Sequence, residues 1–153
     1  MTKKEIQQRV LKDGKPLALA KFEWNPRTKT FSSKEFGLVF DFSDVNRITF
    51  NTGRDCIFDT GSDCTFKTGS YCIFRTWDYC TFNTGSYCTF KTGFECIFNT
   101  DSICAFETGS ACTFKTGCNC TFNTGSGCTF DTLDKLSIKD GINDKEGSSE
   151  ESS

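Results

Sequence analysis

Residues 112–132 read CTFKTGCNCTFNTGSGCTFDT, in which Cys, Thr and Phe return in the same order every eight residues. The unit can be written C-T/I-F-x-T-G-S-x, and its clear run extends over residues 56–135. Ten of the eleven cysteines occupy its first position: Cys56, Cys64, Cys72, Cys80, Cys88, Cys96, Cys104, Cys112, Cys120 and Cys128. Only Cys118 lies off this grid. A fixed period along the chain is typical of a repeat architecture, so this octad decides the fold.

The alternation inside the octad predicts a short strand. Positions 1, 3 and 5 are Cys, Phe and Thr, which places them on one face of an extended segment of about five residues. Position 2 is Thr or Ile, both suited to strands, and position 4 is polar or charged. Position 6 is usually glycine, for which we predict the positive φ of a tight corner. Because one such strand cannot bury its own Phe, we expect stacked coils, that is, an all-β parallel β-solenoid.

The octad grid extends beyond the cysteines in both directions. Apolar residues take the Cys and Phe positions at the two ends: Phe40 and Phe42, Ile48 and Phe50, and Leu136 and Ile138. Atypical terminal units of this kind are expected in a repeat protein. We therefore predict thirteen octads over residues 40–143, an N-terminal cap over residues 1–39 and a disordered acidic tail over residues 144–153.

The number of octads in one coil can be two or three. A 16-residue coil places three opposite-charge pairs on neighbouring strands, namely Asp59–Arg75, Lys91–Glu107 and Lys115–Asp131, against one like pair, Arg75–Lys91. A 24-residue coil instead stacks Lys67, Lys91, Lys115 and Lys139. Facing like charges destabilise a sheet by roughly 0.2–1 kcal/mol each, so charge favours 16 residues. The identical CTFKTG segments at 64, 88 and 112 recur at a spacing of 24, which keeps the three-sided coil as the alternative.

The cap has a different pattern. Thr2 and Glu5 have the spacing of a capping box, which predicts a helix over residues 3–12. Residues 17–24, LALAKFEW, and residues 28–33, TKTFSS, are predicted strands joined by a turn at Asn25-Pro26. We expect this small α+β segment to cover the open edge of the first coil, since exposed sheet edges promote aggregation.

Composition excludes several classes of function. The net charge is −2 and the sequence pI is about 5.2, which gives no reason to expect binding to nucleic acid or membrane through bulk charge. No long apolar run or signal sequence is present, so a cytoplasmic location is expected. The chain has no histidine and hence lacks the commonest general base and metal ligand. No nucleophile–base pair, carboxylate pair or phosphate loop is evident, so we expect no enzyme activity and no cofactor.

The cysteines are predicted to be small buried apolar residues. Zinc sites use closely spaced cysteine pairs, commonly with histidine, whereas the grid cysteines are eight residues apart and face inward. Cys118-Asn119-Cys120 is the one close pair, and it combines a turn residue with a core residue. We therefore expect no metal site, and we expect Cys118 to be the partly exposed thiol.

The repeated CTFxTGS octad, together with the opening EIQQRVLKDGKPLALAKFEWNPRTKTFSS and the later LVFDFS, resembles a group of uncharacterised Cys/Phe octapeptide-repeat proteins. These proteins occur in bacteria, prophages, phages and large DNA viruses. The resemblance covers residues 1–135 and implies a β-solenoid of phage or mobile-element origin, located in a virion or in the host cytosol. It implies no chemistry, because the octad carries none that is known.

Two surface features are candidate binding sites. Aromatic residues gather near Trp77-Asp78, which replaces the usual Gly-Ser, and mark a candidate partner-binding patch: Tyr71, Trp77, Tyr79, Tyr87 and Phe94. With a 16-residue coil, Tyr71 and Tyr87 are predicted to stack on one edge. A row of threonines on one outer face is the second candidate, for a repeating surface such as ice or a polysaccharide: Thr49, Thr65, Thr81, Thr113 and Thr129. Ile97 interrupts that row, and charged residues lie beside it.

These observations predict a non-enzymatic solenoid that acts as a structural or protein-interaction module. One alternative is a binder of ice or polysaccharide, and another is an anti-host or regulatory protein that engages a host target through the aromatic edge. The expected partner is an unidentified protein, and the expected assembly is a monomer or an end-to-end association of copies.

Overall fold

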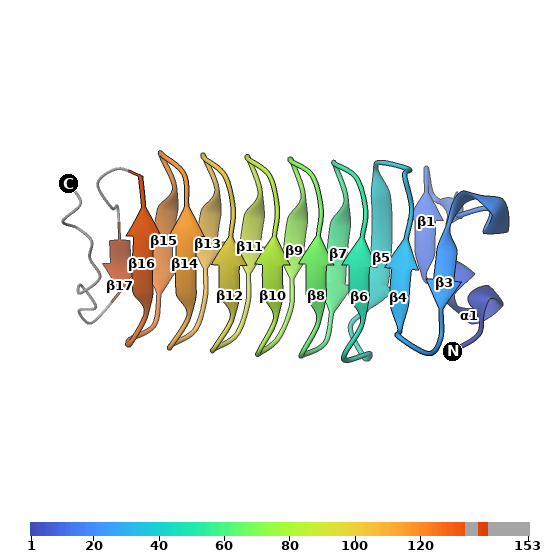
Figure 1. The fold of residues 1–153 in the computed structure, drawn as a ribbon, viewed down its shortest axis with the longest axis horizontal. Coiled ribbons are helices and arrows are strands. Elements are labelled where there is room, and N and C mark those ends of the chain that lie inside the picture. The colour runs from blue at the N-terminus through green and yellow to red at the C-terminus, as the bar shows by residue number, and fades with distance from the viewer. Residues whose placement is uncertain (134–137, 141–153) are drawn as a thin grey trace.

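A computed structural model describes residues 1–133 and 138–140. The chain winds into a rod whose two walls are β-sheets, with the N-terminal segment at one end (Figure 1). In stacking order, sheet A contains β17 (Ile138–Asp140), β15 (Thr121–Thr124), β13 (Ala105–Glu107), β11 (Thr89–Lys91), β9 (Ile73–Arg75), β7 (Ile57–Thr60), β5 (Leu38–Phe42), β1 (Val10–Lys12) and β2 (Lys15–Pro16). Sheet B contains β16 (Thr129–Thr132), β14 (Thr113–Thr116), β12 (Ile97–Asn99), β10 (Thr81–Asn83), β8 (Thr65–Lys67), β6 (Thr49–Asn51), β4 (Thr30–Ser32) and β3 (Glu23–Asn25).

Strand register fixes the coil at 16 residues. In the parallel pair β8–β10, Thr65 lies opposite Thr81 and Phe66 lies opposite Phe82, and the same offset continues to β16. Consecutive octads alternate between the two sheets, so each coil contains two octads and has two sides. The predicted 16-residue coil is therefore confirmed. The three-sided alternative is wrong, because Phe66 and Phe90, which are 24 residues apart, lie in different sheets.

The core is a double column of phenylalanines. Within each sheet, rings of successive coils stack nearly parallel at centroid separations of 4.5–5.2 Å. Between the sheets, each ring meets its neighbours edge to face at 4.9–5.3 Å. Both arrangements suit the quadrupole of the aromatic ring. The predicted inward face is confirmed, since the Cys and Phe positions of the repeat are buried, as are most of its Thr positions.

The corners are built differently from the sequence prediction. None of the described position-6 glycines of the repeat has a positive φ, and the left-handed residue is position 8 instead: Arg47, Asp55, Asp63, Tyr71, Tyr79, Tyr87, Glu95, Ile103, Ala111, Asn119 and Gly127. The position-6 glycines are required by close approach between coils. A Cβ at position 109 would lie 3.0 Å from the carbonyl carbon of Gly93 and 3.0 Å from the nitrogen of Phe94. The prediction of positive φ at these glycines is therefore wrong.

The first coil has a different register from the one predicted. Phe40 pairs with Phe58, so it occupies the Phe position and not the Cys position. Leu38 precedes it at the Cys position, and Phe42 lies opposite Thr60. The regular grid resumes at Thr49, which pairs with Thr65. The turn between β5 and β6 is two residues longer than in the repeat, and this length difference is why extrapolating the octad to residue 40 fails. At the other end, Ile138 pairs with Phe122 as predicted, whereas Leu136 and residues 144–153 lie outside the described residues.

The N-terminal segment closes the rod with two antiparallel hairpins. β1 and β2 form one beside β5, and β3 and β4 form the other beside β6. Ile6, Val10, Leu17 and Phe22 are buried over the end of the core, where Phe22 stacks on Phe31 at 5.1 Å. The N-terminal segment therefore covers the first aromatic layer of the core. Its strands β1 and β3 run antiparallel to their neighbours β5 and β4.

Local predictions for the cap are partly correct. The capping box is present, with Glu5 N–H donating to Thr2 Oγ1 at 3.1 Å and Thr2 N–H donating to Glu5 Oε1 at 2.7 Å. The helix α1 (Lys3–Gln7) is shorter than predicted because Val10–Lys12 pairs with β5 instead. The predicted strand over residues 17–24 is wrong for its first half, which forms the 3₁₀ helix η1 (Leu19–Lys21) before β3. The strand predicted at TKTFSS is confirmed as β4.

Candidate interaction surfaces

The turns that follow the strands of sheet B carry a row of large apolar side chains. Tyr71 and Tyr87 stack with ring centroids 4.8 Å apart and planes 2° apart, so the predicted stacking is confirmed. Ile103 holds the same turn position one coil further on. The exposed fractions of these three residues are 55%, 48% and 42%. We call Tyr71, Tyr87 and Ile103 the tyrosine row. Sequence reasoning missed Ile103, although the spacing of 16 residues through 71, 87 and 103 is a signal that could have found it.

The turns that follow the strands of sheet A carry a second aromatic group. Tyr79 meets Phe94 edge to face at 5.5 Å, and Trp77 is 62% exposed. Asp78 replaces the usual serine, and its Oδ1 accepts a hydrogen bond from Phe94 N–H at 3.0 Å. This bond matches the one that Ser70 Oγ accepts from Ser86 N–H at 3.0 Å, so the non-consensus corner keeps the ladder between coils.

The structure does not bring the two aromatic groups together. Tyr71 follows β8 of sheet B, whereas Trp77, Tyr79 and Phe94 follow β9 and β11 of sheet A. The corresponding turns lie along opposite edges of the rod (Figure 1). Positions 71 and 79 differ by half a coil, which separates them although they are close in sequence. The five candidate residues therefore form two surfaces.

The tyrosine row sits on backbone that does not favour it. The φ angles of Tyr71, Tyr87 and Ile103 are +62°, +60° and +59°, in the left-handed region that glycine and asparagine adopt most easily. A β-branched residue such as Ile103 is especially unfavourable there. The same conformation occurs at position 8 of the other described turns, so it belongs to the corner, and the exposure and stacking of the side chains are what distinguish this row.

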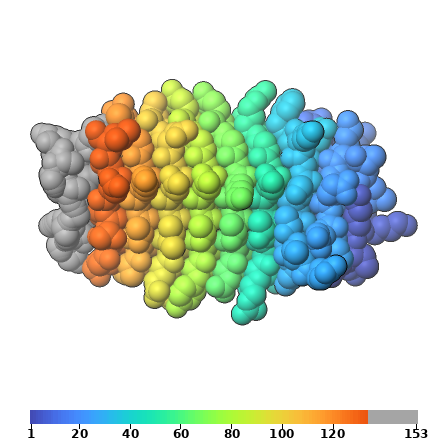
Figure 2. All heavy atoms as spheres, viewed as in Figure 1, coloured from blue at the N-terminus to red at the C-terminus, as the bar shows by residue number. Residues whose placement is uncertain are grey.

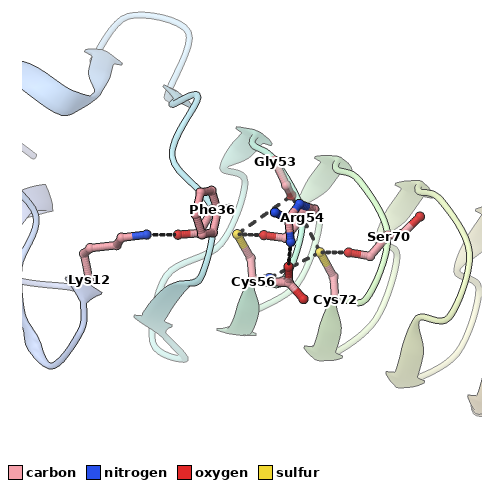
Figure 3. Close-up of polar contacts among 8 residues, drawn as sticks. Lys12, Phe36, Gly53, Arg54, Cys56, Ser70 and Cys72 are labelled. Carbon is pink, nitrogen blue, oxygen red and sulfur yellow. Dashed lines mark hydrogen bonds and ion pairs between the residues drawn. The ribbon is translucent and has the colours of Figure 1, made fainter.

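The cysteines form two buried columns of free thiols. The ten grid cysteines are buried, and Cys118 is only partly buried, as predicted. Figure 3 shows how they are held: the single S–H of Cys72 is shared between Ser70 O at 3.6 Å and Gly53 O at 3.7 Å. Cys56 Sγ contacts the carbonyls of Gly53 and Arg54 in the same way. Cysteine therefore serves as a small core residue whose thiol also satisfies carbonyl oxygens at the corners.

Hydrogen bonds between stacked thiols shift the pKa values of these cysteines in opposite directions. They lower the pKa of Cys56, Cys64, Cys88, Cys96 and Cys120 and raise that of Cys72, Cys80, Cys104 and Cys128. The neighbouring thiols of Cys56 and Cys88, followed by burial, raise the pKa of Cys72 above its ordinary value. Neighbouring thiols and burial likewise raise the pKa of Cys80 and of Cys104. Within residues 1–133 and 138–140, no group of three or more His, Cys, Asp or Glu side chains is placed to hold a metal ion.

The outer face of sheet B presents the threonine row. Register places Thr49, Thr65 and Thr81 on successive strands, and Ile97 then interrupts them before Thr113 and Thr129. Lys67 and Lys115 project from the adjacent row beside asparagines and Asp131. The coils appear as regular bands across the rod in Figure 2. The spacing is periodic, but the chemistry of the face is mixed.

Together these features define a β-solenoid with two sheets, a 16-residue coil, a phenylalanine core and aromatic turns on both edges. Comparisons of the chain with protein-family models, with curated proteins and with solved structures returned no match. Among the described residues, no helix is long and apolar enough to span a membrane.

Proposed function

We propose that the chain is a non-enzymatic β-solenoid that serves as a structural or protein-interaction module, with the tyrosine row as its contact surface. The exposure of Tyr71 and Tyr87, whose rings stack on each other, is the observation that supports this proposal. The rod holds both rings in fixed positions, so little side-chain entropy is lost when a partner binds. Tyrosine is enriched among the residues that dominate binding energy in protein interfaces. A regulatory protein that engages one host target would use the row in the same manner.

The expected partner is a protein with an apolar groove. The two tyrosine rings lie 4.8 Å apart, and Ile103 extends them into a narrow ridge along the edge of the rod. Tyrosine presents an apolar ring with a polar hydroxyl at its tip, which suits a groove with hydrogen-bonding groups at its base. The small net charge of −2 is consistent with recognition by shape and apolar contact.

Paired turn variants test the proposal. Tyr71→Asn with Tyr87→Asn removes the ridge while placing a residue that tolerates positive φ at each turn, so the fold is retained. Glu95→Asn is the matched control, because it introduces the same residue at the same turn position on the opposite edge. In quantitative capture from host lysate, we expect the double variant to lose a protein that both wild type and control retain. Identical retained sets for all three proteins would refute the role of the row.

The threonine row supports a second candidate, a binder of a repeating surface such as ice or a polysaccharide. Thr49, Thr65 and Thr81 lie on adjacent strands at the strand spacing of about 4.8 Å. Partitioning into slowly grown ice, measured for wild type and Thr81→Lys, tests this candidate for ice. Exclusion of the wild type from ice removes that reading, whereas enrichment that Thr81→Lys abolishes would favour it over the tyrosine row.

A further inference from the structure

The outer face of sheet A differs from that of sheet B. Its position-2 row begins with the aliphatic residues Val39, Ile57 and Ile73, which lie on adjacent strands and are 40%, 44% and 48% exposed. The equivalent positions of sheet B are threonines in the same coils. Adjacent exposed aliphatic side chains on a flat sheet form a patch that favours contact with another surface.

The charged row beside this patch has an unusual order. Asp41, Asp59, Arg75 and Lys91 project from β5, β7, β9 and β11 in turn. Like charges are therefore adjacent twice, at Asp41–Asp59 and at Arg75–Lys91, which destabilises the isolated sheet. In the part of the chain that the structure describes, none of these four residues forms an ion pair within 4.0 Å. The acidic half and the basic half of the row thus remain available to an outside partner.

The charged row is complementary in charge to a second copy of itself that runs in the opposite direction. If a second copy faces sheet A with its rod axis reversed, Asp59 meets Arg75 of the second copy and Asp41 meets its Lys91. The pattern extends one step at each end, because Arg9 lies beside Asp41, with Asp41 N–H bonded to Arg9 O at 3.0 Å, and would face Glu107. Arg9 already binds Asp44 at 2.6 Å, so this outer pair would contribute less.

We propose that two copies of the chain associate face to face through sheet A, about a two-fold axis that runs parallel to the strands between β7 and β9. This operation keeps each position along the strand while reversing the order of coils. Ile57 of one copy therefore meets Ile73 of the other at two equivalent contacts, Val39 meets Thr89 of the other copy, and the charged rows pair. A two-fold contact requires such self-complementarity. The association is side by side, whereas the sequence led us to expect a monomer or an end-to-end association.

The outer face of sheet A also contains a shallow groove that side chains of a second copy could enter. The aliphatic row and the charged row border a groove of about 240 Å³ that runs over β5, β7 and β9. The contact spans six strands about 4.8 Å apart, β1 being antiparallel to β5 and the other five parallel, and is about 25 Å long. This is a small interface, for which micromolar affinity is expected. Charge pairing would chiefly select the partner and fix the register, since such pairs contribute more to specificity than to affinity.

Charge-reversal variants test the proposal by sedimentation equilibrium. The wild type should reach twice its mass of 17.1 kDa at concentrations up to about 200 µM, well above the expected dissociation constant. Asp59→Arg places arginines opposite each other across the axis, and Arg75→Asp places aspartates opposite each other, so each variant alone should weaken dimerisation at least tenfold. A mixture of the two variants restores opposite charges at both contacts, so it should form a heterodimer.

The controls separate this contact from other forms of association. Lys67→Asp reverses a charge on sheet B and should dimerise like the wild type, while far-UV circular dichroism verifies that each variant is folded. The tyrosine row lies outside the proposed contact, so Tyr71→Asn with Tyr87→Asn should also dimerise normally. A monomeric wild type, single variants that dimerise normally, or single variants that fail to combine when mixed would each overturn the proposal.

Discussion

Removal of one ring from the middle of the aromatic core should destabilise the whole rod. Phe82 is fully buried and contacts four rings: Phe66 at 4.9 Å, Phe98 at 4.8 Å, Phe74 at 5.1 Å and Phe90 at 5.0 Å. Phe82→Ala loses these contacts and leaves a cavity that the flanking coils cannot fill without breaking their own register. Core Phe→Ala changes cost about 3–5 kcal/mol, and the four aromatic contacts place Phe82 toward the upper end of that range.

The effect should also depend on position along the rod. Each coil contacts only its neighbours, so a weakened central interface can uncouple the two halves of a repeat protein. We expect Phe82→Ala to lower the free energy of unfolding in urea by about 4 kcal/mol and to broaden or split the transition. Thr81→Ala is the control, because its side chain is exposed on the same strand, and it should change stability by less than about 0.5 kcal/mol. A loss below about 1 kcal/mol at Phe82 would refute the reasoning that stacked rings hold the coils together.

Three further predictions follow from the corners and the thiols. Gly109→Ala should destabilise the protein by about 1–3 kcal/mol in thermal or urea unfolding, because its Cβ would meet backbone of the preceding coil at 3.0 Å; an unchanged midpoint would contradict the close approach. Ala111→Gly should stabilise the protein by about 1 kcal/mol by relieving the φ of +60°, and a lower melting temperature would oppose this. Stability should fall as pH rises from about 8.5 to 10, because unfolded thiols lose protons there while the raised pKa of Cys72, Cys80 and Cys104 keeps the folded thiols protonated. The slope should approach about 1.4 kcal/mol per pH unit for each such thiol, and urea melts that are independent of pH over this range would count against it.

The repeating part of the fold could be predicted from the sequence because every octad carries the same pattern of buried, exposed and turn positions. Alternation of Cys, Phe and Thr specifies the inward face, and the charges at position 4 favoured the correct coil length. Asp41 also joins this charged row, however, and adds a like pair with Asp59 that the octad pattern does not include. Its place depends on two extra residues in the turn before Thr49, which a fixed grid cannot represent.

The sequence-based predictions were wrong where the conformation of one coil depends on contact with another. The position-6 glycine was interpreted from local backbone freedom, whereas Gly109 is needed because the neighbouring coil approaches it. Val10 continued a helical pattern in the sequence, but pairing with Phe40 draws it into sheet A. The candidate aromatic patch divided into two surfaces for the same reason, since half a coil separates Tyr71 from Tyr79.

The most direct test of the 16-residue coil is a set of nuclear Overhauser contacts in solution between residues of stacked strands. A 16-residue coil predicts cross-strand contacts between Thr65 and Thr81 and between the rings of Phe66 and Phe82, with the same offset repeated along both sheets. Contacts that pair Thr65 with Thr89 in a parallel ladder, without those to Thr81, would contradict it.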